Sequence, residues 1–328
     1  MYVVTGGAGF IGSNIVAALD TRQPGSVLVC DRLGDGAKWL NLAKRELIDI
    51  VPPEELFAYL DRHPADIEAV IHMGAISSTA ETDADRIVAA NYRLSLALWR
   101  WCAQNQVRLI YASSAATYGD GAKGFDDDAS PAALATLRPL NAYGWSKNLF
   151  DRRIVRLLAG HEAAPPQWAG LKFFNVYGPN EYHKGAQKSV AVQIHEQIAE
   201  GRPARLFKSH RPGTADGGQM RDFIWVGDCV EIVLWLLDHP GVSGLFNCGT
   251  GQARSFADLA HAVFAALGKK SKIDYVPMPE PLRDKYQYFT EARMNRLRAA
   301  GYARPFAALE DGIARYVRDY LGLPDPYR

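Results

Sequence analysis

The stretch Thr5-Gly6-Gly7-Ala8-Gly9-Phe10-Ile11-Gly12 lies between a short apolar run at Met1–Val4 and an apolar helical pattern over Ser13–Leu19. Without glycines, side chains would keep a pyrophosphate away from the backbone N–H groups at the positive end of that helix. Gly6, Gly9 and Gly12 place a glycine at every third position of this turn. A strand, a glycine turn and a helix in this order predict the opening of a dinucleotide-binding unit.

The composition is that of an ordinary globular protein. The 328 residues are 48% hydrophobic and 22% charged with a net charge of +1, so we expect neither nucleic acid nor a membrane as partner. Met1 leads directly into the first strand, which predicts a cytoplasmic protein without a signal peptide. The four cysteines lack metal-ligand spacing, so we expect buried free thiols and no metal. We also expect a homo-oligomer.

A second apolar run, Val27–Cys30, ends in Asp31-Arg32, and Lys38 follows. This is where a doubly wound fold meets the adenosine ribose of its cofactor. An acid there accepts hydrogen bonds from the hydroxyls of NAD, whereas cations pair with the 2′-phosphate of NADP. Two cations beside one acid favour NADP over NAD. The alternative is that Arg32 and Lys38 are merely solvated.

The run Ala69–His72 predicts another buried strand, and Met73-Gly74-Ala75-Ile76-Ser77 follows it. A turn of small residues at a strand's carboxyl end lets a cofactor lie across the sheet edge. The long amphipathic pattern over Asp85–Gln104 predicts a helix that contains Asn91. Asn91 is expected either to tie neighbouring backbones together at the cofactor site or to be a surface residue.

The candidate chemistry follows the run Val107–Ser113, a predicted strand that delivers Ser114 to the same sheet edge. Tyr143 and Lys147 are four residues apart and so share one face of a predicted helix. A lysine charge would lower the pKa of the phenol from about 10 towards neutrality. A phenolate, held by Ser114, can then take a proton from an alcohol while hydride leaves to nicotinamide. The alternative is a core tyrosine beside a solvated lysine.

These motifs resemble the extended short-chain dehydrogenase/reductases, and within them the sugar-nucleotide epimerases that act on ADP-heptose. The matching stretches run through nearly the whole chain: Val4–Ile15, Tyr111–Gly119, Leu140–Lys147, Phe174–Pro179, His183–Gly185, Arg221–Phe223 and Phe289–Thr290. The glycine turn and Tyr143/Lys147 belong to the wide family. His183-Lys184-Gly185 and Asp35-Gly36-Ala37-Lys38 are the features that point to a heptose substrate.

The resemblance implies an NADP-bound epimerase that inverts C6 of the heptose in ADP-heptose and supplies the lipopolysaccharide inner core. The C6 alcohol would be oxidised to an aldehyde, turned about the C5–C6 bond and reduced on its other face. One acid/base is poorly placed for both faces, so Lys184 is our candidate for a second group opposite Tyr143. The alternative is that Lys184 binds a phosphate group.

The expected site residues are therefore numerous. The expected catalytic residues are Tyr143, Lys147, Ser114 and Lys184. The expected cofactor contacts are Gly6, Gly9, Phe10, Ile11, Gly12, Asp31, Arg32, Lys38, Met73, Gly74, Ala75, Ser77, Asn91, Tyr143, Lys147, Val176 and Lys184. The expected substrate contacts are Ser114, Asn175, Ala186, Gln193, Phe207, Lys208, Arg221 and Tyr286.

Two of these positions depart from the family pattern. Ala186 and Gln193 stand where the resemblance implies a small polar residue and a histidine, and the connection over residues 209–219 is longer than usual. Arg221, with Lys208 and Tyr286, would clamp the diphosphate and base of the substrate. The alternative for Arg221 is a surface salt bridge.

We expect an α/β fold, a doubly wound parallel Rossmann sheet with a smaller C-terminal α/β substrate lobe. Residues 1–174, with return segments from about 222–250, would bind NADP, and residues 175–328 would mainly bind substrate. Another NAD(P)-dependent epimerase, such as a 4-epimerase, or a dehydratase of the same fold stays open. A dehydratase would need an acid near Thr117 and Tyr118, where none stands. A non-catalytic NADP-binding regulator is disfavoured because Tyr143 and Lys147 are both present.

Overall fold

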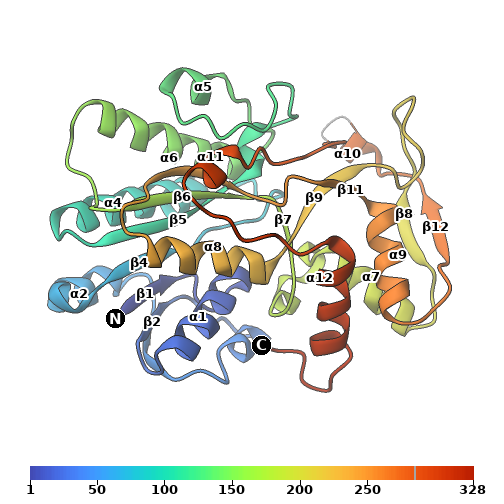
Figure 1. Ribbon diagram of the computed structural model, residues 1–328, viewed down its shortest axis with the longest axis horizontal. Helices are drawn as coiled ribbons and strands as arrows, with labels where there is room; N and C mark the ends of the chain where they lie inside the picture. The colour runs from blue at the N-terminus through green and yellow to red at the C-terminus, as the bar shows by residue number, and fades with distance from the viewer. Residues whose placement is uncertain (284–285) are drawn as a thin grey trace.

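The computed structural model of the chain describes residues 1–283 and 286–328. Its main feature is a seven-stranded parallel sheet in the order β10-β6-β5-β4-β1-β2-β3 (Figure 1). The strands are β1 (Tyr2–Thr5), β2 (Val27–Cys30), β3 (Leu47–Val51), β4 (Ala69–His72), β5 (Arg108–Ser114), β6 (Trp168–Phe173) and β10 (Gly244–Cys248). The prediction of a doubly wound parallel sheet with a smaller C-terminal part is confirmed.

Helices cover both faces of this sheet. On one face α1 (Phe10–Arg22) packs against α8 (Val226–Asp238). On the other lie α2 (Leu56–Arg62), α4 (Leu94–Gln104) and α6 (Ala142–Ala159), and Trp101 of α4 donates to Asp61 of α2 at 2.7 Å. Shorter helices join them: η1 (Ala37–Asn41), η2 (Pro64–Asp66), α3 (Ala84–Ile87), η3 (Val88–Arg93), η4 (Ala115–Tyr118) and α5 (Pro131–Thr136).

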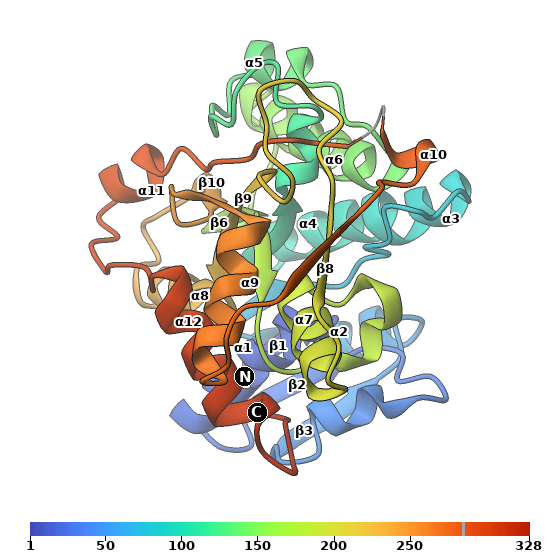
Figure 2. The same ribbon diagram turned by 90° about the vertical axis from the view of Figure 1, so that its right-hand side faces the viewer.

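A second group of elements forms a lobe beyond the carboxyl ends of the strands, at the right of Figure 1 and towards the viewer in Figure 2. It has a three-stranded sheet, β11-β9-β7, and a two-stranded sheet, β12-β8. The strands are β7 (Asn175–Tyr177), β8 (Ala204–Phe207), β9 (Met220–Trp225), β11 (Ala253–Ser255) and β12 (Ile273–Val276). The helices of the lobe are η5 (Tyr182–Gln187), α7 (Val190–Ala199), α9 (Phe256–Ala266), α10 (Glu280–Arg283), α12 (Leu309–Tyr316) and η6 (Val317–Leu321). Helix α11 (Asn295–Ala299), which lies between them in the sequence, packs against β10 of the main sheet.

The two parts have separate apolar cores. One cluster fills the space between the seven-stranded sheet and its helices, and the other fills the lobe around α7, α9 and α12. The chain crosses between them more than once, because β10 pairs with β6 in the main sheet while β9 pairs with β7 in the lobe. All four cysteines are buried as free thiols.

The structure differs from the sequence prediction in the helix that contains Asn91. The single helix expected over 85–104 is interrupted by the π-helical segment η3, which contains Asn91. An inserted π turn rotates the residues around it relative to a regular helix, and such turns are frequent at functional sites.

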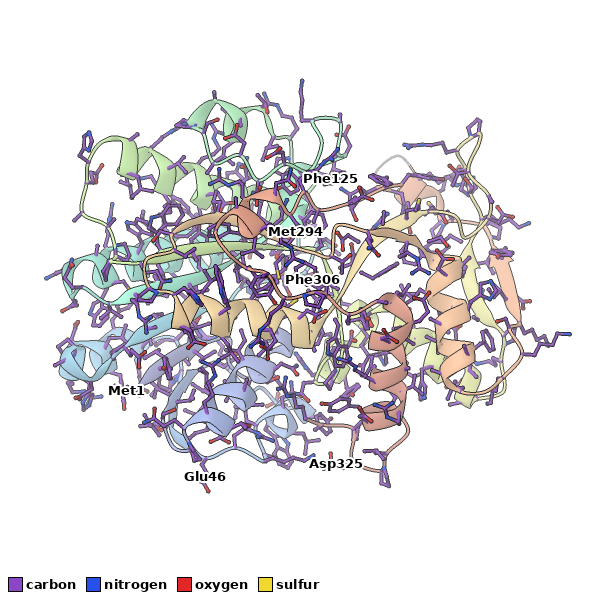
Figure 3. The ribbon with its side chains drawn as sticks, in the orientation of Figure 1. Met1, Glu46, Phe125, Met294, Phe306 and Asp325 are labelled. Carbon is purple, nitrogen blue, oxygen red and sulfur yellow. The ribbon has the colours of Figure 1, made fainter. Side chains whose placement is uncertain are left out.

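The C-terminal segment returns to the N-terminal half of the chain. Lys44 Nζ lies 2.8 Å from Asp325 Oδ2 and donates to Tyr327 O at 2.6 Å, and Figure 3 labels Glu46 and Asp325 along the same lower edge.

Among residues 1–283 and 286–328, no helix has both the length and the apolar character needed to cross a bilayer.

Candidate active site

A cleft of about 1150 Å³ lies where the carboxyl ends of the main strands meet the lobe. Residues that follow β1, β2, β4 and β5 line one side of it, and residues of β7, η5, α7 and α9 line the other. A crevice outside the carboxyl ends of parallel strands is where open α/β sheets bind their ligands. The cleft is therefore the candidate active site.

The glycine turn forms the floor of this cleft beside α1. A Cβ on Gly12 would lie 2.1 Å from Gly6 O, so a side chain there cannot be accommodated without moving the turn. Gly6 has φ +64°, and a Cβ on it would lie 2.6 Å from Gly74 Cα in the loop after β4. Both positions require glycine, which keeps the N-terminus of α1 open to a phosphate group.

The end of β2 carries an internal charge cluster. Asp31 Oδ2 accepts from Ala8 N at 2.9 Å, and Asp31 Oδ1 accepts from Arg32 N at 2.7 Å and from Lys38 Nζ at 2.6 Å. The Arg32 guanidinium forms a paired salt bridge with the Glu54 carboxylate, and both side chains are largely exposed. Asp31 is thus occupied by donors of the protein itself, while Lys38 and Arg32 stand at the mouth of the cleft.

Asn91 is fully buried behind the loop that follows β4. Its side chain accepts from Ile76 N at 2.8 Å and donates to Ile76 O at 3.0 Å and to Ser146 Oγ of α6 at 3.0 Å. Asn91 therefore ties this loop to η3 and α6, which is the first of the two roles that the sequence left open. It shapes the cleft without lining it.

Ser114, Tyr143 and Lys147 meet at the carboxyl end of β5. Lys147 is buried, and its Nζ donates to Ala112 O at 2.8 Å. Ser114 lies close enough to the Tyr143 phenol for its side chain to lower the pKa of that group, and Ser114 Oγ accepts from Ala116 N at 3.1 Å. Asn141 begins α6 by accepting from Gly144 N at 2.8 Å, so Tyr143 and Lys147 lie in the first turns of this helix.

The pKa of Tyr143 differs from the sequence prediction, which had the lysine lower it towards neutrality. Burial raises the pKa of Tyr143, the Ser114 side chain lowers it, and the charge of Asp151 raises it. Burial also lowers the pKa of Lys147 to about 8, while Asp151 raises it. The prediction was wrong because the buried environment disfavours the charged form of both groups.

Lys184 reaches the cleft from η5 in the lobe. Its Nζ lies 5.5 Å from the centre of the Phe10 ring, and burial lowers its pKa while Glu181 raises it. Glu181 is buried and accepts from Ser189 Oγ at 2.8 Å, Tyr316 OH at 3.1 Å and Gly178 N at 3.2 Å. Glu181 therefore anchors the segment that holds Lys184 over the cleft.

A separate aromatic cluster surrounds Arg221 in the lobe. The Arg221 guanidinium lies 5.2 Å from the centre of the Tyr286 ring and 5.6 Å from that of Phe256, and the Phe207 ring lies 6.2 Å from Tyr286. Burial lowers the pKa of Arg221. Arg221 is thus no surface salt bridge, and Phe256 joins its cluster to the cleft wall.

The structure brings most of the predicted site residues together. Those that line the cleft are Gly6, Gly9, Phe10, Ile11, Gly12, Asp31, Arg32, Lys38, Met73, Gly74, Ala75, Ser77, Ser114, Tyr143, Lys147, Asn175, Val176 and Lys184. Those outside its lining are Asn91, Ala186, Gln193, Phe207, Lys208, Arg221 and Tyr286. Among the latter, Ala186 and Lys208 are exposed, and Gln193 Nε2 donates to Lys188 O at 2.8 Å.

Several residues of the cleft lining were not predicted as site residues. Those with a charged, amide or imidazole side chain are Glu54, Arg86, Glu181, His183, Gln187 and Lys188. Only His183 had a local signal, in the His183-Lys184-Gly185 stretch. Its ring lies 3.2 Å from Asn41 Nδ2, and burial with the charges of Lys38 and Lys184 lowers its pKa to about 4.

No group of His, Cys, Asp or Glu side chains in the described part of the chain is arranged to hold a metal ion.

Comparison with known proteins agrees with this geometry. Residues 2–249 match the model of the NAD dependent epimerase/dehydratase family. The chain is 51% identical over 330 residues to the ADP-L-glycero-D-manno-heptose-6-epimerase of Nitratidesulfovibrio vulgaris, with all of both chains covered.

Two solved structures share the fold over nearly the whole length. The ADP-L-glycero-D-manno-heptose-6-epimerase of Helicobacter pylori is similar at a TM-score of 0.77 and 25% identity, covering 97% of this chain and 95% of that one. The UDP-glucose 4-epimerase of Thermus thermophilus, in complex with NAD, is similar at 0.72 and 27% identity, covering 95% and 96%. The extent of the family match, together with the full-length relative, shows that this chain belongs to the NAD dependent epimerase/dehydratase family.

Proposed function

We propose that this protein inverts C6 of the heptose in ADP-D-glycero-D-manno-heptose to give ADP-L-glycero-D-manno-heptose, for the lipopolysaccharide inner core. The observation that carries the proposal is the meeting of Ser114, Tyr143 and Lys147 in the same cleft as the glycine turn. The full-length relative at 51% identity, which is named for this reaction, supports the choice of substrate.

The residues around the glycine turn fit a pyridine dinucleotide. The turn has no room for a Cβ at Gly6 or Gly12, which leaves backbone N–H groups at the start of α1 accessible to a pyrophosphate. Asp31 already accepts from three protein donors, whereas Lys38 and Arg32 stand beside it. This arrangement favours NADP over NAD, because the 2′-phosphate can pair with Lys38 and Arg32 and needs no hydrogen-bond acceptor from Asp31. When bound, NADP supplies a reversible hydride acceptor.

The protein's own groups move the proton. Tyr143 takes the proton of the C6 hydroxyl, Ser114 holds the oxygen by a hydrogen bond, and Lys147 stabilises the phenolate. The C6 aldehyde then rotates about the C5–C6 bond, which exposes its other face. Lys184, whose pKa burial lowers, is the candidate acid/base for the oxygen in that second position. Arg221 and Tyr286 are candidates for contacts to the ADP moiety.

A dehydratase of the same architecture fits the site less well. Dehydration needs an acid beside the tip of β5 to protonate the leaving hydroxyl. Thr117 and Tyr118 stand there, and both are engaged: Thr117 accepts from Lys172 Nζ at 2.8 Å, and Tyr118 donates to Asn247 Oδ1 at 2.6 Å. Neither is free to take that role.

The test is to incubate the holoenzyme with ADP-D-glycero-D-manno-heptose in deuterated water and to follow C6 by NMR. We expect inversion at C6 without added NADP when the protein retains its cofactor, and no deuterium at C6, because the hydrogen returns from the nicotinamide. UDP-glucose, in a parallel sample, should not react. Failure to invert C6 would refute the substrate, and substantial C6 deuterium at early turnover would refute the redox route.

A further inference from the structure

A buried pair of opposite charges lies directly behind the catalytic wall of the cleft, and the mechanism above does not use it. Lys172 of β6 and Asp151 of α6 both have fully buried side chains, and Lys172 Nζ lies 3.0 Å from Asp151 Oδ2. An ion pair without access to water is expensive to build, because both charges lose their hydration. The cost of burying both charges indicates that the pair has a specific role.

The pair is connected on all sides to the strand tip that carries Ser114. Asp151 accepts from Ser113 Oγ at 2.6 Å and from Tyr111 OH at 3.2 Å, both on β5. Lys172 donates to Thr117 Oγ1 at 2.8 Å, and Thr117 in turn donates to Ser114 O at 2.8 Å. The two charges therefore hold the segment Ser113–Thr117 from both sides.

Asp151 of this pair also shares a helix face with the proposed acid/base residues. Tyr143, Lys147 and Asp151 are spaced by four residues along α6, so they follow one another on the same face of the helix. On the sheet, the Cα atom of Lys172 pairs with that of Ser113, one residue before Ser114. Asp151 is thus one helical turn from Lys147, and Lys172 is the cation that balances it.

We propose that Lys172 and Asp151 are a positioning pair, which holds Ser114 against α6 and keeps the region behind Lys147 electrically neutral. An unbalanced carboxylate one turn from Lys147 would favour protonated Lys147 and disfavour the phenolate of Tyr143. An unbalanced lysine would do the opposite. The pair therefore sets the pH at which the acid/base becomes active. The kinetic part of this inference rests on the proposed C6 epimerisation.

Other charged and titratable groups also face this region. Tyr111 of β5 and Tyr118 of η4 surround the pair, and the Tyr118 ring centre lies 4.9 Å from Lys172 Nζ. Burial raises the pKa of both phenols well above the ordinary value, so both stay neutral. His72 of β4 faces Lys147, and burial lowers its pKa to about 3. Arg86 and Lys184 also line the cleft, and both are left unchanged in the variants compared below.

The experiment compares Lys172→Met, which leaves the carboxylate, with Asp151→Asn, which leaves the cation. The titration of Lys147 is followed by NMR in protein labelled with [ε-¹³C]lysine and freed of cofactor, the signal being assigned with Lys147→Arg. We expect the midpoint, about 8 in the wild type, to rise by about one pH unit in Lys172→Met and to fall by about one in Asp151→Asn. The double variant should return close to the wild-type midpoint.

The pH profile of kcat supplies a second measurement. The acidic limb should move up in Lys172→Met and down in Asp151→Asn, with kcat on that limb about tenfold lower in the former and KM little changed. Asp222→Asn is the matched control, because Asp222 is also buried and accepts from the backbone of Thr250, Gly251 and Ala292. It should lower the melting temperature and leave the Lys147 midpoint in place.

Shifts in the same direction in the two single variants, or no shift in either, would overturn the proposal. So would a loss of kcat with unchanged limb and midpoint, because that is the behaviour of a purely structural pair. If Lys172→Met does not fold, Asp151→Asn and the double variant decide, since neither leaves a buried carboxylate unpaired. If the wild type fails to invert C6, the proposed function falls, and the cofactor-free titration still tests the pair.

Discussion

Lys38 Nζ lies 2.6 Å from Asp31 Oδ1 at the carboxyl end of β2, where the adenosine ribose of a dinucleotide is expected. The acid that would read the ribose hydroxyls of NAD is therefore paired within the protein. The neighbouring cation Arg32 is paired with Glu54 at the surface. The preference for NADP over NAD that we propose would depend on how these two ion pairs rearrange around the 2′-phosphate.

Arg32→Ala should weaken NADP binding more than NAD binding, because only NADP carries the 2′-phosphate. Glu54→Gln should do the reverse and strengthen NADP roughly two- to fivefold, since it frees Arg32 from an exposed pair that is worth little by itself. Dissociation constants of both cofactors, measured by calorimetry, test this. Equal changes for NADP and NAD would show that Arg32 does not contact the phosphate.

Tyr143→Phe should leave NADP binding intact and lower turnover by at least ~10²-fold, which is the usual contribution of general acid–base catalysis. Tyr59→Phe on α2, outside the cleft lining, is a matched control and should retain wild-type turnover. Steady-state kinetics with ADP-D-glycero-D-manno-heptose provide the measurement. Turnover of Tyr143→Phe within a few-fold of wild type would remove the phenol from the mechanism.

Lys184→Gln separates the two roles considered for this residue. As the second acid/base, Lys184 should be needed for kcat, and its loss should lower kcat by ~10²-fold with little change in KM. As a grip on phosphate, its loss should raise KM and leave kcat near the wild-type value. The ratio of the two effects in steady-state kinetics decides between them.

Gly12→Ala should abolish cofactor binding, because its Cβ would lie 2.1 Å from Gly6 O and displace the turn. Gly241→Ala is the matched control, since a Cβ there meets no heavy atom within 4 Å. Tryptophan fluorescence titration with NADP and thermal unfolding should show a loss only in Gly12→Ala. Unchanged NADP affinity in Gly12→Ala would mean that the turn does not hold the pyrophosphate.

The protein should lose stability on mild acidification through His72. Burial, followed by the charge of Lys147, lowers the pKa of His72 from 6.5 to about 3, and its ring bonds Thr5 Oγ1 at 2.6 Å and Ser95 Oγ at 2.8 Å. Between these pH values the unfolded chain binds the proton and the folded chain does not, so stability falls as pH decreases. The contribution of this group amounts to roughly 1–2 kcal/mol between pH 6.5 and 5.

Urea unfolding of the wild type and of His72→Asn at pH 6.5 and 5 measures this contribution as the difference in their pH dependence. His161→Asn, at an exposed position with φ 55° that asparagine tolerates, is the control and should behave as the wild type does. An equal pH dependence in wild type and His72→Asn would contradict the assignment.

Much of this protein is determined by patterns that are local in the sequence. The glycine turn, the buried four-residue strands Val27–Cys30 and Ala69–His72, and the four-residue spacing of Tyr143 and Lys147 each have a fixed structural meaning within a few residues. They were sufficient to predict the fold class and the placement of Tyr143 and Lys147 on one helix beside the cleft. The edge strand Leu47–Val51 was not recognised, because Ile48 and Ile50 on it are exposed and follow no buried pattern.

Only the tertiary structure decided the environment of these residues. Burial raises the pKa of Tyr143 where the sequence predicted the opposite, since desolvation depends on every segment that surrounds the phenol. Asp151 and Lys172 come from a helix and a strand 21 residues apart and become a pair only when β6 is placed beside β5. Side chains from distant segments meet because the sheet brings its strand ends to one edge, and no local pattern records which of them will do so.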